Sequence, residues 1–255
     1  MPMKPLFMIT NDDGVNAKGL RSLVDVVRDL GDIVVMAPAQ NTSGKAHSFT
    51  ASRPIHVEAL SKYEGLDIYA CDGTPVDCVK VCEQYYCPRR PSLVLSGINH
   101  GSNSSINIVY SGTMAAVLEA SMSGLQAIGF SLLDHSPNAD FTPTLPFIRK
   151  IIVSALEKGL PQSTSLNVNF PVLDDGVIKG MRVCRQSEAR WVDSYERQFD
   201  SKGNACYCIA GRFECDDNKE GTDQWALENG YVSIVPTTID FTAYNKIEEI
   251  KNVFE

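Results

Sequence analysis

The chain has 255 residues, 44% of them hydrophobic, which is enough to bury a full core in one large domain. Its formal net charge of −8 argues against a nucleic-acid polymer as the main partner, because binding a phosphate backbone needs clustered Lys and Arg. No segment is long and apolar enough to span a bilayer, and the N-terminus lacks the features of a signal peptide, so we expect a cytoplasmic protein that does not bind membranes.

Short apolar runs alternate with helical patterns through the first two thirds of the chain. Residues 6–9 predict a buried strand, residues 17–30 carry apolar side chains at three- and four-residue steps typical of a helix, and residues 33–37 predict a second strand. Strand, helix and strand joined by short links are typical of a parallel βαβ unit.

This alternation continues to about residue 170. A polar loop over 97–110 is expected to follow the strand at 92–96. The whole pattern predicts an α/β fold with a Rossmann-like, doubly wound and mostly parallel sheet. The further strands are expected near 55–57 and 66–70 and at 92–96, 127–132 and 166–169, and the further helices over 76–82, 113–123 and 145–157.

The pattern changes beyond about residue 181, where turns become frequent and periodicity weakens. We expect one domain over 1–255, in which a core of about 1–185 carries a C-terminal extension of about 186–255. The extension should contain hairpin strands, a strand at 232–235 and a terminal helix near 244–253.

The eight cysteines are expected to be reduced free thiols. Cys206, Cys208 and Cys215 leave a zinc site open as the less favoured interpretation, because they lack the paired C-x-x-C pattern of such sites.

Polar residues follow several of the predicted strands, at the edge where parallel sheets bind ligands. Asp12 and Asp13 come directly after the first strand, and two adjacent carboxylates at the end of an apolar run need a compensating charge. Ser43 lies in the loop after the second strand and Asn99 follows the strand at 92–96. Their carboxylate, hydroxyl and amide oxygens form the hard donor set that suits Mg²⁺ or Mn²⁺.

A phosphoryl group would fit beside this predicted metal site. Ser111, Gly112 and Thr113 stand at a predicted helix start, which offers backbone N–H groups, the positive end of the helix dipole and two hydroxyls. Gly44 allows a second close backbone contact.

Each of these features also has an ordinary structural interpretation. The sequence NDDG at 11–14 is common turn chemistry, Ser111 or Thr113 can simply cap a helix, and Asn99 can be a turn residue. A P-loop is excluded because the glycine it requires upstream is Ala39 here. The convergence of these residues on one sheet edge favours a site.

The chain resembles the SurE family, the survival-protein-E nucleotidases, over nearly its whole length. The order and spacing of the matching segments are specific, although no one segment is. They are TNDDGV at 10–15, AP at 37–38 with NTSG at 41–44, GTPVDCV at 73–79, SGIN at 96–99, YSGT at 110–113, NVNFP at 167–171, and GTD at 221–223 with GYVS at 230–233.

This resemblance implies a Rossmann-like core, one divalent cation per subunit and hydrolysis of nucleoside 5′- and 3′-monophosphates, in some members also of short polyphosphate. The metal ligands of the family would be Asp12, Asp13, Ser43 and Asn99. Its phosphate loop would correspond to 111–113. The resemblance also implies a homodimer or homotetramer in which C-terminal hairpins are exchanged between subunits.

One loop departs from the family pattern. Members commonly have Gly-Pro-Asn-x-Gly after the metal-binding Asn, followed by acidic residues, whereas residues 101–107 here read GSNSSIN. Asn103 is retained and is expected to contact phosphate. The changed loop is expected to affect substrate preference more than the chemistry.

The mechanism expected from these residues is an in-line attack on phosphorus by metal-activated water, which Asp12 or Asp13 orients or deprotonates. An aspartyl-phosphate route usually needs Asp-x-Asp after the first strand, and a signalling receiver domain needs an acceptor Asp where the strand at 92–96 ends in Ser and Gly. A nucleotide-binding protein without catalysis, or a phosphatase for another phosphomonoester, stays open as an alternative.

Overall fold

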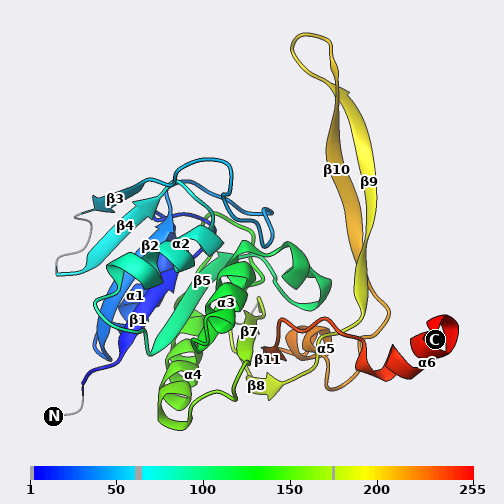
Figure 1. Cartoon of the computed structure of the whole chain (residues 1–255). Helices are drawn as coiled ribbons and strands as arrows, with labels where there is room; N and C mark the ends of the chain where they lie inside the picture. The colour runs from blue at the N-terminus through cyan, green and yellow to red at the C-terminus, as the bar shows by residue number, and fades with distance from the viewer. Residues whose placement is uncertain (1–2, 61–64, 174–175) are drawn as a thin grey trace.

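The computed structural model describes residues 3–60, 65–173 and 176–255. Within them a nine-stranded sheet runs in the order β3-β4-β2-β1-β5-β6-β7-β11-β8, and β9 and β10 form a separate two-stranded hairpin (Figure 1). The strands are β1 (Leu6–Thr10), β2 (Asp32–Pro38), β3 (Val57–Leu60), β4 (Asp67–Cys71), β5 (Leu93–His100), β6 (Ala127–Leu132), β7 (Ser165–Phe170), β8 (Gly180–Val183), β9 (Ala189–Phe199), β10 (Ala205–Cys215) and β11 (Tyr231–Thr237).

The centre of the sheet is parallel. β1 pairs in parallel with β2 on one side and with β5 on the other, and β4, β6 and β7 extend the parallel arrangement. Among the described strands of this sheet, the pairs β3–β4 and β7–β11 are antiparallel. The predicted doubly wound, mostly parallel sheet is confirmed, and the direction of chain winding changes at β1, between β2 and β5.

Helices cover both faces of this sheet (Figure 1). α1 and α4 share a hydrophobic core with one face, while α2 and α3 share a second core with the other. α3 is buried on almost every side, so its apolar residues show no amphipathic period. The helices are α1 (Lys18–Val27), α2 (Pro75–Val81), α3 (Gly112–Met122), α4 (Leu145–Lys158), α5 (Asp223–Glu228) and α6 (Ile247–Phe254), with a π-helical turn at Cys82–Tyr86 and 3₁₀ turns at Ser105–Tyr110, Thr142–Thr144 and Tyr244–Lys246.

The predicted loop over 97–110 is wrong in part. β5 continues through His100 after an irregularity between Ser96 and Asn99, and Asn99 pairs with Ser131 of β6. Ser105–Tyr110 then forms a 3₁₀ turn. Polar residues and glycine masked this strand end, because a strand that stops being apolar at a ligand-binding edge looks like a loop in sequence.

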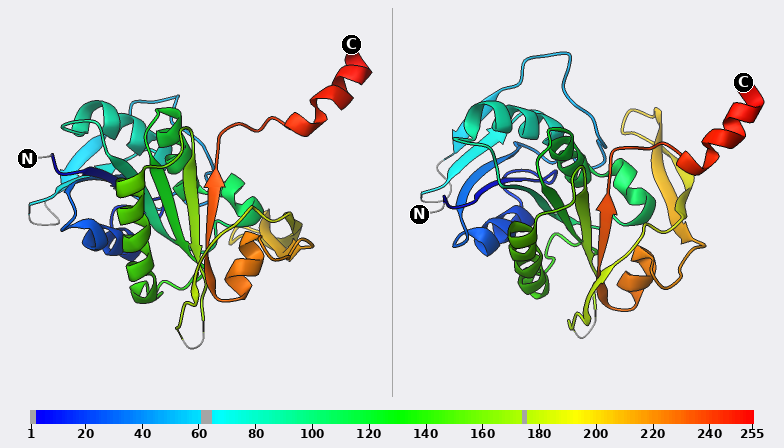
Figure 2. Two further views of the ribbon diagram at one scale, coloured as in Figure 1. Left: turned by 90° about the horizontal axis from the view of Figure 1, so that it is seen from below. Right: turned by 60° about the horizontal axis from the view of Figure 1, so that its bottom comes forward.

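The C-terminal third contributes both to the body and to two projections. β11 enters the main sheet between β7 and β8, so the sheet takes up a strand from beyond residue 185. The expected hairpin strands are present as β9 and β10, and they rise away from the body (Figure 1). The expected terminal helix is α6, at the end of a segment that leads away from the sheet (Figure 2). The short helix α5 was not predicted.

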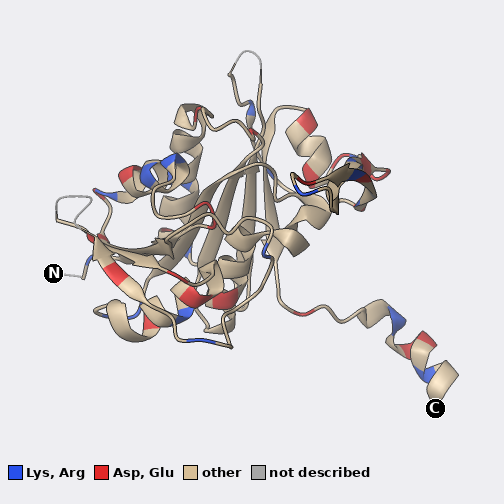
Figure 3. Ribbon diagram, turned by 90° about the horizontal axis from the view of Figure 1, so that it is seen from above, with Lys and Arg blue, Asp and Glu red and all other residues tan. Residues whose placement is uncertain are grey.

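Acidic and basic residues are interspersed on the ribbon, and α6 carries both signs (Figure 3). No helix within residues 3–60, 65–173 and 176–255 is long and apolar enough to cross a membrane. All eight cysteines are free, as expected. The part of the chain that the structure describes has no cluster of three His, Cys, Asp or Glu side chains able to hold a metal, so the zinc interpretation of Cys206, Cys208 and Cys215 is wrong.

Candidate active site

The turn after β1 is closed by the side chain of Asn11. The Asn11 side chain accepts a hydrogen bond from the Gly14 N–H at 3.2 Å and donates to the Gly14 carbonyl at 3.1 Å. This bridge closes the turn through its first and last residues. The side chains of Asp12 and Asp13 between them therefore remain available for other partners.

Asp12 is buried against the start of α3. The Thr113 hydroxyl donates to Asp12 Oδ1 at 2.6 Å, and the Asp12 side chain is almost completely shielded from solvent. Burial, opposed by the Thr113 hydrogen bond and reinforced by the Asp13 charge, raises the pKa of Asp12 from 3.8 to about 6. The hydrogen bond from Thr113 therefore does not supply the full positive charge that would compensate a buried Asp12 carboxylate.

Asp13 faces the loop that follows β2. Its Oδ1 accepts from the Ser43 hydroxyl at 3.4 Å and its Oδ2 from the His100 N–H at 3.4 Å. Burial raises the pKa of Asp13 as well, although the His100 and Ser43 contacts oppose the change. Both contacts are long, so neither compensates the carboxylate strongly.

The loop that carries Ser43 is fixed at two points. At one end Thr42 donates its N–H to the Asp12 carbonyl at 2.8 Å. At the other end the Thr50 hydroxyl donates to Asp77 Oδ2 at 2.6 Å, and Asp77 also forms the capping box of α2 with Thr74. Burial raises the pKa of Asp77, but these hydrogen bonds hold it below its usual value, so Asp77 is an ionised anchor.

Asn99 is oriented by its own chain. Its Nδ2 donates to the Gly101 carbonyl at 2.9 Å, which leaves Oδ1 as the free acceptor of the buried amide. His100, the next residue, contacts Asp13. The structure thus brings Asp12, Asp13, Ser43 and Asn99 to one edge of the sheet.

The start of α3 contributes backbone donors. Ser111 caps the helix by accepting from the Met114 N–H at 3.0 Å. The remaining N–H groups of the first turn have no partner within the helix and carry the positive end of its dipole. The structure therefore uses the Ser111 and Thr113 side chains for capping and for Asp12, and it is the backbone that remains to bind an anion.

Gly112 is required by the closeness of α3 to Asp12. A Cβ at this position would lie 2.7 Å from the Asp12 Cβ and 2.9 Å from its Oδ2, distances at which one of the two must move. No side chain other than hydrogen fits between the helix start and the carboxylate.

We expect Gly112→Ala to lower phosphate release about a hundredfold, because a displacement of about 1 Å at a reacting centre has an effect of this size. The fold should survive, since alanine is the better helix former. Steady-state kinetics together with thermal unfolding separate the two effects. A variant with wild-type kcat/KM would show that Asp12 need not stay in place.

Asn103 lies in the loop that departs from the family pattern, and it is buried in hydrogen bonds. Its Nδ2 donates to the Ser131 hydroxyl at 2.7 Å, and its N–H donates to Asn169 Oδ1 at 2.9 Å. The Asp223 carboxylate accepts from the Ser105 N–H at 2.7 Å. These bonds hold the loop without the proline and glycine common in the family, and they leave a contact between Asn103 and phosphate as a prediction.

The donor set at this edge fits a divalent cation. Two carboxylates with raised pKa values lie beside an amide oxygen and a hydroxyl, all of them hard oxygen donors. A bound cation would supply the positive charge that the buried pair lacks. The neighbouring N–H groups of α3 would donate to the oxygens of an anion bound to the same cation.

Comparison with known proteins decides the family. The model of the family described as survival protein SurE matches residues 7–193. The chain belongs to this family. A SurE protein of Christiangramia forsetii, named 5′-nucleotidase SurE, is 47% identical over 251 residues, which cover 98% of this chain and 96% of the relative. The 5′-nucleotidase SurE of Flavobacterium psychrophilum is 45% identical over 250 residues, which cover 98% of this chain and 97% of that relative.

The SurE fold extends through the C-terminal third. The crystal structure of the SurE protein from Aquifex aeolicus aligns with a TM-score of 0.83 at 35% identity, covering 98% of this chain and 100% of that one. The later SurE-like segments have a structural explanation here, because Asn169 and Asp223 hold the loop of Asn103. Sequence reasoning matched the segments that contain these two residues to the family but gave the residues no role, since their polar contacts join positions more than 60 residues apart.

Proposed function

We propose that the chain is a divalent-metal-dependent phosphomonoesterase that hydrolyses nucleoside 5′-monophosphates, and also 3′-monophosphates, to nucleoside and phosphate. The observation that carries this proposal is the pair of buried carboxylates at the end of β1, placed beside the N-terminus of α3. The relatives named 5′-nucleotidase SurE support the nucleotide as substrate, because they match over nearly their full lengths.

Asp12, Asp13, Ser43 and Asn99 would hold the metal, which we propose to be one Mg²⁺ or Mn²⁺ per subunit. When bound, such a cation neutralises phosphoryl charge and makes an attacking water more acidic. Asp12 or Asp13 would orient or deprotonate an attacking water. The start of α3 from Ser111 to Thr113, together with Gly44 and Asn103, would hold the equatorial oxygens as charge spreads over them. The Ser111 N–H already donates to the Ile108 carbonyl, so the backbone donors would come from the residues that follow it.

The test is phosphate release from a panel of nucleoside 5′- and 3′-monophosphates, short polyphosphate and other phosphomonoesters, with added Mg²⁺ or Mn²⁺. We expect release from the nucleotides that disappears with chelator and returns with excess metal. Tight nucleotide binding without release under all these conditions would overturn catalysis in favour of a binding protein. Trapping a phosphorylated Asp would instead indicate an aspartyl-phosphate route.

We also propose that residues 1–255 form one domain whose C-terminal extension mediates a homodimer or homotetramer. Large apolar side chains are exposed on both projections of Figure 1, where they would be costly for a lone subunit. On the hairpin they include Tyr195, Tyr207 and Ile209, and near α6 they include Ile250, Val253 and Phe254.

Deletion of residues 244–255 is expected to shift the protein towards monomer and to lower its solubility little, because every residue of α6 is exposed. Light scattering coupled to size exclusion measures this change. An unchanged mass would show that α6 does not hold the oligomer.

A cytoplasmic location is proposed on the basis of the eight unpaired cysteines, because free thiols suit a reducing compartment.

A further inference from the structure

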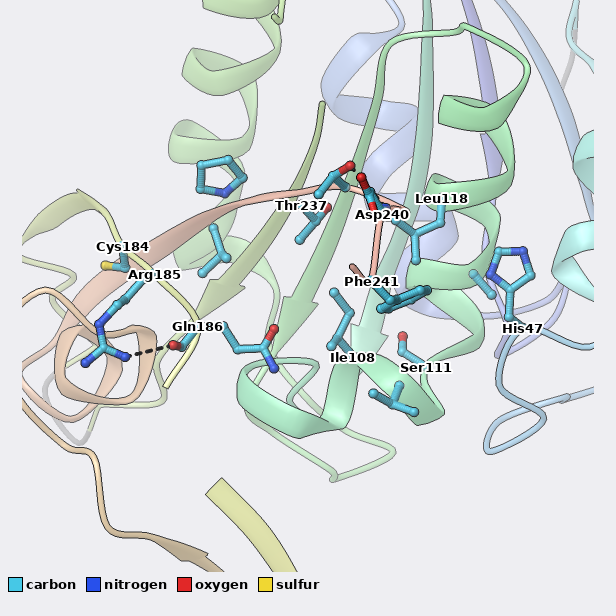
Figure 4. Close-up of a pocket in the computed structure, with 15 residues that line it drawn as sticks. His47, Ile108, Ser111, Leu118, Cys184, Arg185, Gln186, Thr237, Asp240 and Phe241 are labelled. Carbon is cyan, nitrogen blue, oxygen red and sulfur yellow. Dashed lines mark hydrogen bonds between the residues drawn. The ribbon is translucent and has the colours of Figure 1, made fainter. Parts of the chain in front are cut away.

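A pocket of about 760 Å³ opens beside α3 (Figure 4). Its wall on one side is α3, and on the other it is the segment that leaves β11. The 3₁₀ turn Ser105–Tyr110 and residues 184–186 complete it. A volume of this size falls within the range of about 300–1,000 Å³ that small-molecule pockets have.

The pocket is continuous with the candidate active site through one helix. Ser111, Ala115 and Leu118 of α3 line it, while Thr113 of the same helix contacts Asp12. Ser111 thus belongs to both the helix start that faces the phosphate and the rim of the pocket. A molecule whose phosphate lies at the start of α3 has this pocket as a neighbouring place for its remaining part.

The lining suits a flat heterocycle. Ile108, Val109 and Leu118 provide apolar surface, and the Phe241 side chain, 87% exposed, offers an aromatic face in the same pocket. A nucleobase buries its faces against apolar and aromatic groups, and stacking on one aromatic ring contributes about 1–3 kcal/mol. Polar groups at the edges can then contact the base's own donors and acceptors.

His47 is a polar group of this pocket whose ring contacts a buried side chain. Its Nε2 lies 3.4 Å from Glu119 Oε2, and the side chain of Glu119 is 6% exposed and paired with Lys80 Nζ at 2.5 Å. With Nε2 directed to Glu119, Nδ1 is the ring atom that is left to contact a bound molecule. Glu119 and Lys80 are the charged groups packed against the ring, and they fix its position on the rim.

We propose that this pocket binds the base of the substrate, with Phe241 stacking on its face and His47 contacting its edge. The proposal rests on the proposed nucleotidase function and specifies which surface distinguishes a nucleotide from other phosphomonoesters.

The test compares AMP with ribose 5-phosphate, which differs from AMP only in lacking the base. In the metal-loaded full-length protein, Phe241→Ala and His47→Ala should each lower kcat/KM for AMP about tenfold, mainly through KM, because each loses about 1.4 kcal/mol of base binding. Turnover of ribose 5-phosphate should stay within about twofold. Tyr85→Ala and His56→Ala, an exposed aromatic residue and an exposed histidine away from the pocket, should change the turnover of neither substrate.

Equal losses on both substrates, or no loss on AMP, would overturn the proposal. Calorimetric binding of adenosine, which has no phosphate, gives a readout independent of turnover: wild type should bind it and Phe241→Ala should bind it about tenfold more weakly. If wild type binds adenosine in this pocket but releases no phosphate from either ester, the nucleotidase proposal fails while the base site stands. Absence of adenosine binding together with normal AMP hydrolysis would place the base elsewhere.

Discussion

Asp12→Asn is expected to lower the rate of phosphate release at least about a thousandfold and, at the same time, to stabilise the metal-free protein. The loss follows because the variant removes one of two carboxylates at the proposed metal site, a contribution of several kcal/mol. The gain follows because burial raises the pKa of Asp12 to about 6, so ionising it in the fold is costly. The difference from the ordinary value of 3.8 corresponds to at most about 3 kcal/mol.

The size of the stability gain expected for Asp12→Asn depends on pH. Since the folded pKa of Asp12 lies above its unfolded value, its protonated form stabilises the fold fully below about pH 4, and that contribution is lost as pH rises to about 6 and above. The variant's advantage should therefore be absent at pH 4 and full at pH 8. Denaturant unfolding with chelator measures it. A variant that is less stable than wild type at pH 8, or that keeps its turnover, contradicts this account.

Thr113→Val is expected to reduce activity and metal affinity about 10- to 100-fold although it keeps the shape of the side chain. The Thr113 hydroxyl donates to Asp12 Oδ1 at 2.6 Å and lowers the pKa of that carboxyl. Without this bond the pKa of Asp12 rises further, so the acidic limb of the pH–rate profile should move to higher pH.

Thr113→Ser is the matched control, because it keeps the hydroxyl and loses only a methyl group. It should retain most of the activity and an unmoved acidic limb. If valine and serine at position 113 gave the same pH profile, the hydrogen bond to Asp12 would have no part in catalysis, and Thr113 would serve only the packing of a fully buried position.

The sheet and most helices could be predicted from the sequence because each has a local signal. α1 buries Leu20, Leu23 and Val24 at helical spacing, and β1 is a short apolar run that ends in a turn. β9 and β10 could not be placed in the same way, since most of their side chains are exposed and show no alternation. α5 was missed because six residues are too few for a helical period.

The residues of the candidate site likewise fall into those that have a local sequence signal and those that do not. Asp12, Asp13, Ser43 and Asn99 each follow a predicted strand, so topology alone placed them at one edge. Capping was one of the two interpretations of Ser111, but the contact of the Thr113 hydroxyl with Asp12 was not predictable, because a hydroxyl at a helix start gives no sign of the carboxylate that it will meet. His47 was missed for a related reason: its partner Glu119 lies 72 residues away on another element.

The hydrogen bond between the Ser105 N–H and the Asp223 carboxylate has a consequence for the order in which the enzyme matures. The proposed metal ligands, all from the first hundred residues, are made early, yet the loop beside them is held in part by a residue 118 positions beyond Ser105. β11, which joins β7 in the sheet, is synthesised later still. A nascent chain that has emerged only as far as β7 therefore lacks a completed site, and competence for hydrolysis arrives with the last quarter of the polypeptide.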